Sequence, residues 1–180
     1  MMIKNLKSFR FLMFWGFLFG QTCVAGAQVT TLLDAGSWRA VQAVSGTSHA
    51  CSMHSSYPDG RIIFIHFTPD GEMLMQLSSP AWRMRNGASI RFDVQFDELR
   101  SRNMSSTVIY MSDSPVALLQ ASIDTRQMDS FIEDFIRSSQ MSVIFRTGNE
   151  RDWIFDLDGS AAVSEAFIQC VERMPTTTQP

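Results

Sequence analysis

Two histidines and a cysteine fall within six residues, as His49-x-Cys51-x-x-His54, and imidazole and thiolate groups are ligands for zinc and copper. Met73 and Met75 add thioether sulfur, a soft donor that favours copper. A copper or zinc site with His49, His54, Met73 and Met75 as ligands is therefore one hypothesis. Two observations count against it. Cys51 has a competing use in a disulfide, and the two methionines are spaced as core residues on one face of a strand.

The third histidine, His66, lies inside the apolar run of residues 61–67, where a buried histidine is the simpler interpretation. The chain contains no Gly-x-Ser-x-Gly elbow, phosphate-binding loop, dinucleotide fingerprint or Cys-x-x-Cys motif. Members of a Ser-His-Asp triad need not be neighbours in sequence, so a hydrolase with an unrecognised site stays open. It would need His49, His54 or His66 in a cleft beside a carboxylate or a serine. The pattern favours a protein without catalytic activity, and we expect no cofactor.

Tryptophan and arginine gather around Asn86-Gly87, a dipeptide typical of hairpin turns. Arg83 and Arg85 would share one strand face and could pair with Asp93 opposite, which makes a solvated ion-pair surface the simpler interpretation. Both residue types are frequent in interface hot spots, so a protein-binding edge is the alternative. Its candidate residues are Trp82, Arg83, Arg85 and Arg91.

The first 27 residues have the three parts of a secretory signal peptide. Lys4, Lys7 and Arg10 make a basic start, residues 11–20 form an uncharged apolar core, and small residues ending at Ala27 supply a cleavage site. An apolar core of ten residues is too short to cross a bilayer as a helix. We expect cleavage near Ala27, a periplasmic or secreted location, and no integral membrane segment in the mature chain.

The mature chain, residues 28–180, is acidic. Removing the three basic residues of the leader leaves 12 arginines, no lysine and 18 acidic residues, a net charge of −6. Such a chain offers no basic patch for phosphate groups, so we expect no nucleic-acid partner. Cys51 and Cys170 are the two cysteines that remain, and in an exported chain an even pair indicates a disulfide. Two buried free thiols are the alternative.

Most of the mature chain has strand patterns. In residues 89–97, Ile90, Phe92, Val94 and Phe96 alternate with polar residues, which predicts a strand with one buried face. The run of residues 61–67 is apolar throughout and is expected to be a central strand covered on both faces. Residues 29–36 are interpreted as a lead-in. The other expected strands are 38–44, 50–53, 73–77, 82–85, 107–111, 116–123, 141–146 and 153–157.

Two segments have helical spacing instead. Met128, Phe131, Ile132, Phe135 and Ile136 recur at the period of a helix face, with Asp124 or Thr125 as its cap. A final helix, capped by Ser160, places Cys170 on its inner face near Cys51. The apolar residues expected on that face are Val163, Ala166, Phe167, Val171 and Met174. Pro175 ends the helix, and residues 175–180 form a flexible tail.

These patterns predict an α+β fold: an antiparallel β-sandwich or twisted sheet of about eight strands, with two packed helices, one of them C-terminal. Residues 1–27 are the signal peptide, and residues 28–174 form one β-rich domain. The order of elements resembles the invasion-associated locus B-like family of small exported proteins of Gram-negative bacteria. The features that carry the resemblance are the leader, Trp38, Cys51, Ser79-Pro80-Ala81-Trp82, Leu157-Asp158-Gly159-Ser160 and Cys170.

The resemblance implies a periplasmic or surface-associated protein without enzymatic activity, in some members linked to host-cell invasion, and it carries over no catalytic residue. The residues themselves support the same function. We expect an exported protein-interaction module whose partner is another envelope protein or a host protein. It could serve as an accessory or inhibitor of an envelope enzyme or secretion system, or as a host-interaction factor. The alternatives are the envelope hydrolase and the periplasmic copper or zinc protein.

Overall fold

The computed structural model describes residues 28–110 and 116–174, so the expected leader and tail lie outside the described residues. The fold is α+β, as predicted, with a single antiparallel sheet of ten strands and two α-helices, one of them C-terminal. Residues 29–36, expected as a lead-in, belong to the first strand. The strands are β1 (Gln28–Ala35), β2 (Trp38–Ser45), β3 (Ser48–Ser56), β4 (Ile62–Phe67), β5 (Met73–Ser78), β6 (Ser89–Phe96), β7 (Arg102–Tyr110), β8 (Ala117–Ile123), β9 (Gln140–Phe145) and β10 (Trp153–Asp156).

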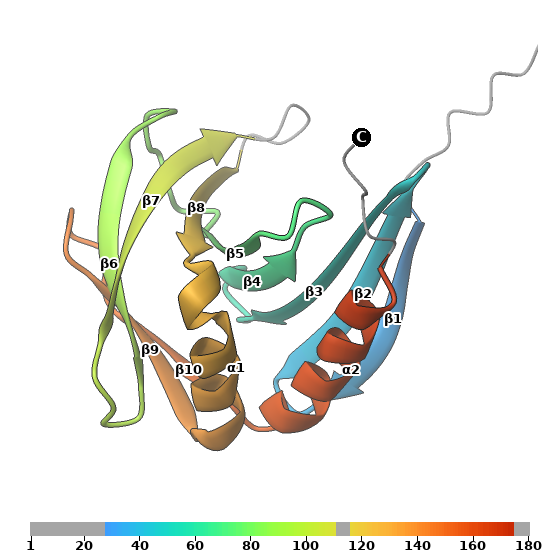
Figure 1. The fold of residues 1–180 in the computed structure, drawn as a ribbon. Helices are drawn as coiled ribbons and strands as arrows, with labels where there is room; N and C mark the ends of the chain where they lie inside the picture. The colour runs from blue at the N-terminus through green and yellow to red at the C-terminus, as the bar shows by residue number, and fades with distance from the viewer. Residues whose placement is uncertain (1–27, 111–115, 175–180) are drawn as a thin grey trace, which may run out of the picture.

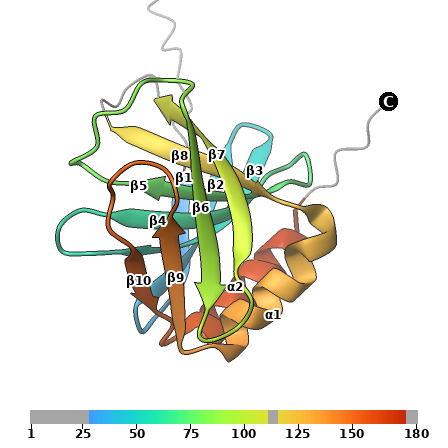
Figure 2. The same cartoon turned by 90° about the vertical axis from the view of Figure 1, so that its left-hand side faces the viewer.

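The strand order is β1-β2-β3-β4-β5-β8-β7-β6-β9-β10, an open sheet rather than a two-sheet sandwich. The sheet curls strongly, so that β1–β3 face β6, β7, β9 and β10 across a trough (Figure 1). The helices α1 (Met128–Arg137) and α2 (Ser160–Glu172) lie side by side on the inner side of this trough (Figures 1 and 2). Such an arrangement buries one face of the sheet and the inner faces of both helices in one core.

The inner face of the sheet is apolar across neighbouring strands. Met53, Ile65 and Met75 stand opposite one another on β3, β4 and β5, and all three are fully buried. On β4, Ile63 and Ile65 are buried, whereas Ile62, Phe64 and His66 are only half-buried on the outer face. The prediction that residues 61–67 are covered on both faces is therefore wrong, because both helices pack on the same side of the sheet.

The β6 strand has the buried face that its alternation predicts, but its expected hairpin with residues 82–85 is wrong. Both edges of β6 are occupied, one by β7 and the other by β9. No edge is left for residues 82–85, which form an irregular connection instead. The turn at Asn86-Gly87 exists, since the Ala88 N–H donates to the Arg85 carbonyl at 3.0 Å.

Local hydrogen bonds begin the first helical segment. Asp124 accepts from the backbone N–H of Arg126 at 2.9 Å and caps a 3₁₀ turn, Thr125–Gln127, which leads into α1. Hydrogen bonds from the side chain and then the backbone of Arg126 lower the pKa of Asp124 from its usual 3.8 to about 2. Asp124 is thus a cap, as predicted, but of the 3₁₀ turn rather than of α1 itself.

A glycine, not the expected Ser160, occupies the cap position of α2. Gly159 has φ of 82°, and a Cβ there would lie 2.1 Å from the carbonyl oxygen of Ala35. Gly36 faces the same contact from the other side, where a Cβ would lie 2.2 Å from the Asp158 carbonyl oxygen. Only glycine allows both the left-handed conformation and this close approach. The two glycines thereby hold the start of α2 against the β1–β2 turn.

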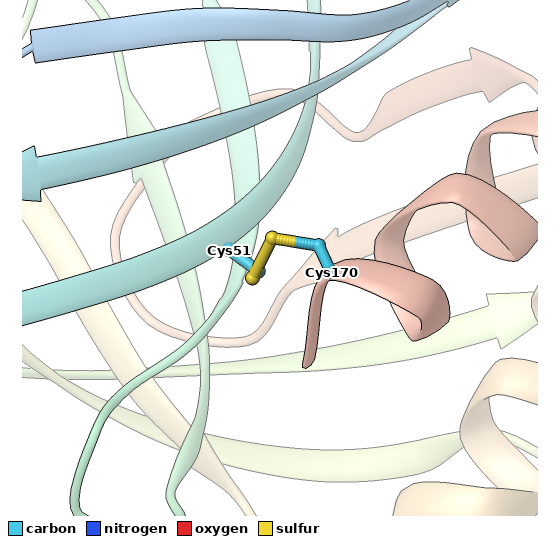
Figure 3. The surroundings of a disulfide bond; sticks show 2 residues. All are labelled: Cys51 and Cys170. Carbon is cyan, nitrogen blue, oxygen red and sulfur yellow. A yellow bond between two sulfur atoms is a disulfide. The ribbon is translucent and has the colours of Figure 1, made fainter. Parts of the chain in front are cut away.

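The predicted disulfide joins Cys51 on β3 to Cys170 near the end of α2 (Figure 3). The two Cα atoms are 5.9 Å apart and both cysteines are buried. The bridge is therefore placed within the core, where it holds the C-terminal half of α2 to the sheet.

Candidate binding groove between the two helices

The apolar residues of α1 contribute to two different surfaces. Phe131 and Phe135 are fully buried against the sheet. Met128, Ile132 and Ile136 follow each other at intervals of four residues and are only half-buried. At about 100° per residue, this second row lies beside the buried row and faces toward α2. One side of α1 therefore forms the wall of a groove rather than part of the closed core.

The facing wall belongs to α2 and the floor to the sheet. Phe167, Ile168 and Val171 line the groove from α2, while Phe67 and Met73, which are paired across β4 and β5, line it from below. Ile168 is 38% exposed, so a large apolar side chain at the groove remains in contact with water. The groove has a volume of about 510 Å³, within the range of ligand-binding pockets.

Charged side chains stand along the rim of this groove. Asp129 and Glu133 border it from α1, and Glu172 borders it from α2. Arg137 is the cation among its lining residues, and it pairs with Glu133 at 2.7 Å. Asp129 and Glu172 make no ion pair within the described part of the chain. The rim is therefore acidic around an apolar interior.

The side chains that line the groove give it an apolar interior with charged edges. Among residues 28–110 and 116–174, those lining it are apolar, carboxylate or arginine side chains, with no serine, cysteine or histidine. The hydroxyl, thiol and imidazole groups that most often act as nucleophile and base in covalent catalysis are therefore not part of this lining. The lining can remove an apolar surface of a ligand from water, and the charged rim can select ligands by their charge.

The four proposed metal ligands do not come together. On β3, alternation places His49 on the face of Cys51 and His54 on the opposite face, beside the ring of Phe64 at 5.2 Å. Met73 and Met75 are buried in the core, as their spacing suggested. No group of three histidine, cysteine or acidic residues that could hold a metal ion occurs among the described residues. The proposed ligand set is therefore wrong, because the strand divides it between two faces.

Two of the three histidines lie on the outer face of the sheet. Burial lowers the pKa of His66, and burial followed by the nearby charge of Arg39 lowers the pKa of His54. His49 instead lines a separate hollow of about 600 Å³ with Ser48 and Asp70. This is the combination that the hydrolase alternative needs. No hydrogen bond joins these three side chains within the described residues.

The structure places Trp82 in the core, not at a surface. Its indole is 5% exposed and stacks on Trp153, with ring centroids 5.1 Å apart and planes 18° apart. Both indole N–H groups donate to one carboxylate, that of Glu150, at 2.7 and 3.0 Å. Trp82 therefore anchors the connection between β5 and β6, and its ring is not available as the centre of an interface.

The three arginines predicted with it are exposed but have different roles. The Arg83 guanidinium donates to the carbonyl oxygens of Pro80 and Trp82, both at 2.8 Å, and so stabilises the connection. Arg85 and Arg91 have no side-chain hydrogen bond or ion pair in the parts of the chain that are described. Arg91 lies on β6 and Arg85 in the connection before it, and both are exposed.

Asp93 does not meet Arg83 or Arg85, and it is not solvated as expected. It is buried between β7 and β9, where Asn103 donates to it at 2.6 Å and Arg146 at 2.8 Å. Burial by itself would raise the pKa of Asp93, but these two hydrogen bonds reverse the effect and the pKa lies below its usual value. The ion pair predicted for this strand therefore exists with a different arginine.

Comparison with known proteins adds no further assignment, since no protein family, no curated protein and no solved structure matches the chain. The resemblance to the invasion-associated locus B-like family stays a prediction. Within the described residues, no helix has the length and apolar character needed to span a membrane.

Sequence reasoning missed the groove, although one signal was present. Ile168 falls outside the inward face predicted for the final helix, and the apolar stripe of the other helix is wider than one buried row requires. An apolar residue off the core face, beside a broad stripe, indicates a second contact surface. The two features could be combined only once α1 and α2 were seen to be neighbours.

Proposed function

We propose that this protein is an exported, non-catalytic interaction module that binds a partner protein in the groove between α1 and α2. The observation that carries the proposal is the groove itself: an apolar interior with half-exposed Ile132, Ile136 and Ile168, with no serine, cysteine or histidine of the described residues in its lining. Contact between exposed apolar side chains and water is unfavourable in free energy, and binding of a partner removes these side chains from water.

The supports of the groove favour binding without rearrangement. Both ends of α2 are held, by Gly159 against the β1–β2 turn and by Cys170 through the disulfide. A wall that is already positioned loses little conformational entropy on association. A disulfide at this place also fits an exported protein, because disulfides persist in oxidising compartments. The partner that we propose is an envelope protein or a host protein that meets the exported chain.

Site-specific crosslinking tests the proposal. A photo-reactive amino acid at position 168 should capture one protein in intact cells of the source organism, whereas the same group at position 154 should not. Ile154 is the matched control because it is also an exposed isoleucine, 56% exposed on β10, outside the groove.

Direct binding must then confirm the captured protein. With the purified partner, Ile168→Ser should weaken binding by about tenfold or more, and Ile154→Ser should leave it unchanged. Equal capture at both positions, or equal affinity of the two serine variants, would contradict the groove as the binding site. Protein sequencing of the exported form should find Gln28 at its N-terminus, and a chain that stays in the cytoplasm would contradict export.

A further inference from the structure

The groove is bordered by carboxylates on both of its sides. On α1, Asp129 and Glu133 are four residues apart and so lie one above the other. On α2, Glu172 lies four residues after Ile168 and borders the groove from the other side. The two helices therefore present an apolar channel with carboxylates at both of its edges.

The helices leave part of this negative charge uncompensated. Glu133 is paired with Arg137, but Asp129 and Glu172, the other carboxylates of the lining, make no ion pair within residues 28–110 and 116–174. Glu172 also stands at the C-terminal end of α2, where the helix dipole disfavours an anion, and the last turn of α2 contains no basic residue. Cations brought by a partner would therefore meet unpaired carboxylates on both sides of the groove.

We infer that the occupant of the groove is a basic amphipathic helix of the partner, and this inference rests on the proposed function. The ten residues of α1 span about 15 Å, so the groove matches a helix of about three turns. The apolar face of that helix packs on Ile132, Ile136 and Ile168, as in helix-in-groove recognition. Lysine or arginine residues on both sides of this face meet Asp129 and Glu172. An anionic lipid surface does not fit, because the same carboxylates repel it.

Three synthetic peptides of equal length separate apolar packing from charge. The first has leucines at i, i+3, i+4 and i+7 with lysine elsewhere, the second replaces each lysine by glutamate, and the third scrambles the first. Binding to the purified, oxidised protein is measured by fluorescence anisotropy at low and high salt. We expect the first peptide to bind at least about tenfold more tightly than either of the others, with affinity that falls as salt rises.

Charge variants locate the contact. The double variant Asp129→Asn, Glu172→Gln should weaken binding of the lysine peptide by about tenfold, the sum expected of two modest ion pairs. A matched double variant, Glu98→Gln with Asp152→Asn, removes two exposed carboxylates outside the groove and should leave affinity unchanged. Circular dichroism of both variants shows that each is folded.

The outcomes separate this inference from the proposed function. Equal affinity for the lysine and glutamate peptides, equal affinity for the scrambled peptide, or equal loss in both charge variants would overturn the inference of a basic helix. If crosslinking at position 168 still identifies a partner whose purified form needs Ile168, the groove remains the binding site and only its occupant is different. Failure of that crosslink as well would overturn both.

Discussion

The paired indoles of Trp82 and Trp153 provide the sharpest test of how this fold is held together. The Glu150 carboxylate accepts both indole N–H groups, and the two rings are almost completely buried. We predict that Glu150→Ala destabilises the protein although Glu150 itself lies in a loop. The reason is that two buried donors lose their acceptor at once, and an unpaired buried donor costs about 1–3 kcal/mol.

The expected magnitude follows from the exposure of the site. Two unpaired donors would cost about 2–6 kcal/mol, but Glu150 is half-exposed, so water can reach part of the vacated space. We therefore expect a loss of about 2–3 kcal/mol. For a domain of this size that loss corresponds to a fall in Tm of about 5–10 °C. Glu150→Gln keeps one acceptor oxygen and should lose about half as much.

Urea unfolding followed by far-UV circular dichroism gives the free energy of unfolding. Glu98→Ala is the control, because Glu98 is exposed beyond β6 and has no side-chain partner among the described residues. It should change the free energy of unfolding by less than about 0.5 kcal/mol. If Glu150→Ala and Glu98→Ala have the same midpoint at unchanged slope, the carboxylate does not hold the two indoles, and the structural role assigned to Trp82 is refuted.

Three further changes test other parts of the fold. The double variant Cys51→Ala, Cys170→Ala should lose at most about 4–5 kcal/mol in urea unfolding, the chain-entropy value for a bridge spanning 119 positions, and a loss below about 1 kcal/mol would contradict that account. Proton NMR should find that Asp124 titrates near pH 2. Because its pKa is depressed in the folded protein, the stability that Asp124 contributes is present above pH 4 and is lost as pH falls toward 2. Asp124→Asn should abolish that pH dependence of stability. Gly159→Ala should cost more than about 1 kcal/mol, since it combines a positive φ with a steric clash, whereas Gly148→Ala, at a positive φ in open space, should cost less.

Several features followed from the sequence because their causes are local. The alternation of Phe92, Val94 and Phe96 predicts a strand with one buried face, since successive strand residues point to opposite sides. The recurrence of Phe131 and Phe135 predicts a helix with a buried side for the equivalent reason. The disulfide was predictable because only two cysteines remain after the expected leader, so only one pairing is available.

The metal-site hypothesis for His49 and His54 failed for a specific reason. An odd separation along one strand, five positions in this case, puts His49 and His54 on opposite faces. The strand was expected only over residues 50–53, which excludes both, while β3 extends over Ser48–Ser56. The boundaries of a strand depend on the neighbours with which it pairs, and these are distant in sequence.

The sequence by itself determined the composition of each surface: which residues are apolar, which carry charge, and at what period they recur. Tertiary structure alone decided which of these surfaces meet. Trp82 became a core residue because Trp153 and Glu150, about 70 positions later, lie beside it. The groove exists because α1 and α2, 22 residues apart in the chain, pack side by side and leave Ile132 and Ile168 facing the same space. Long-range packing of this kind depends on the order of strands in the sheet, which no local pattern encodes.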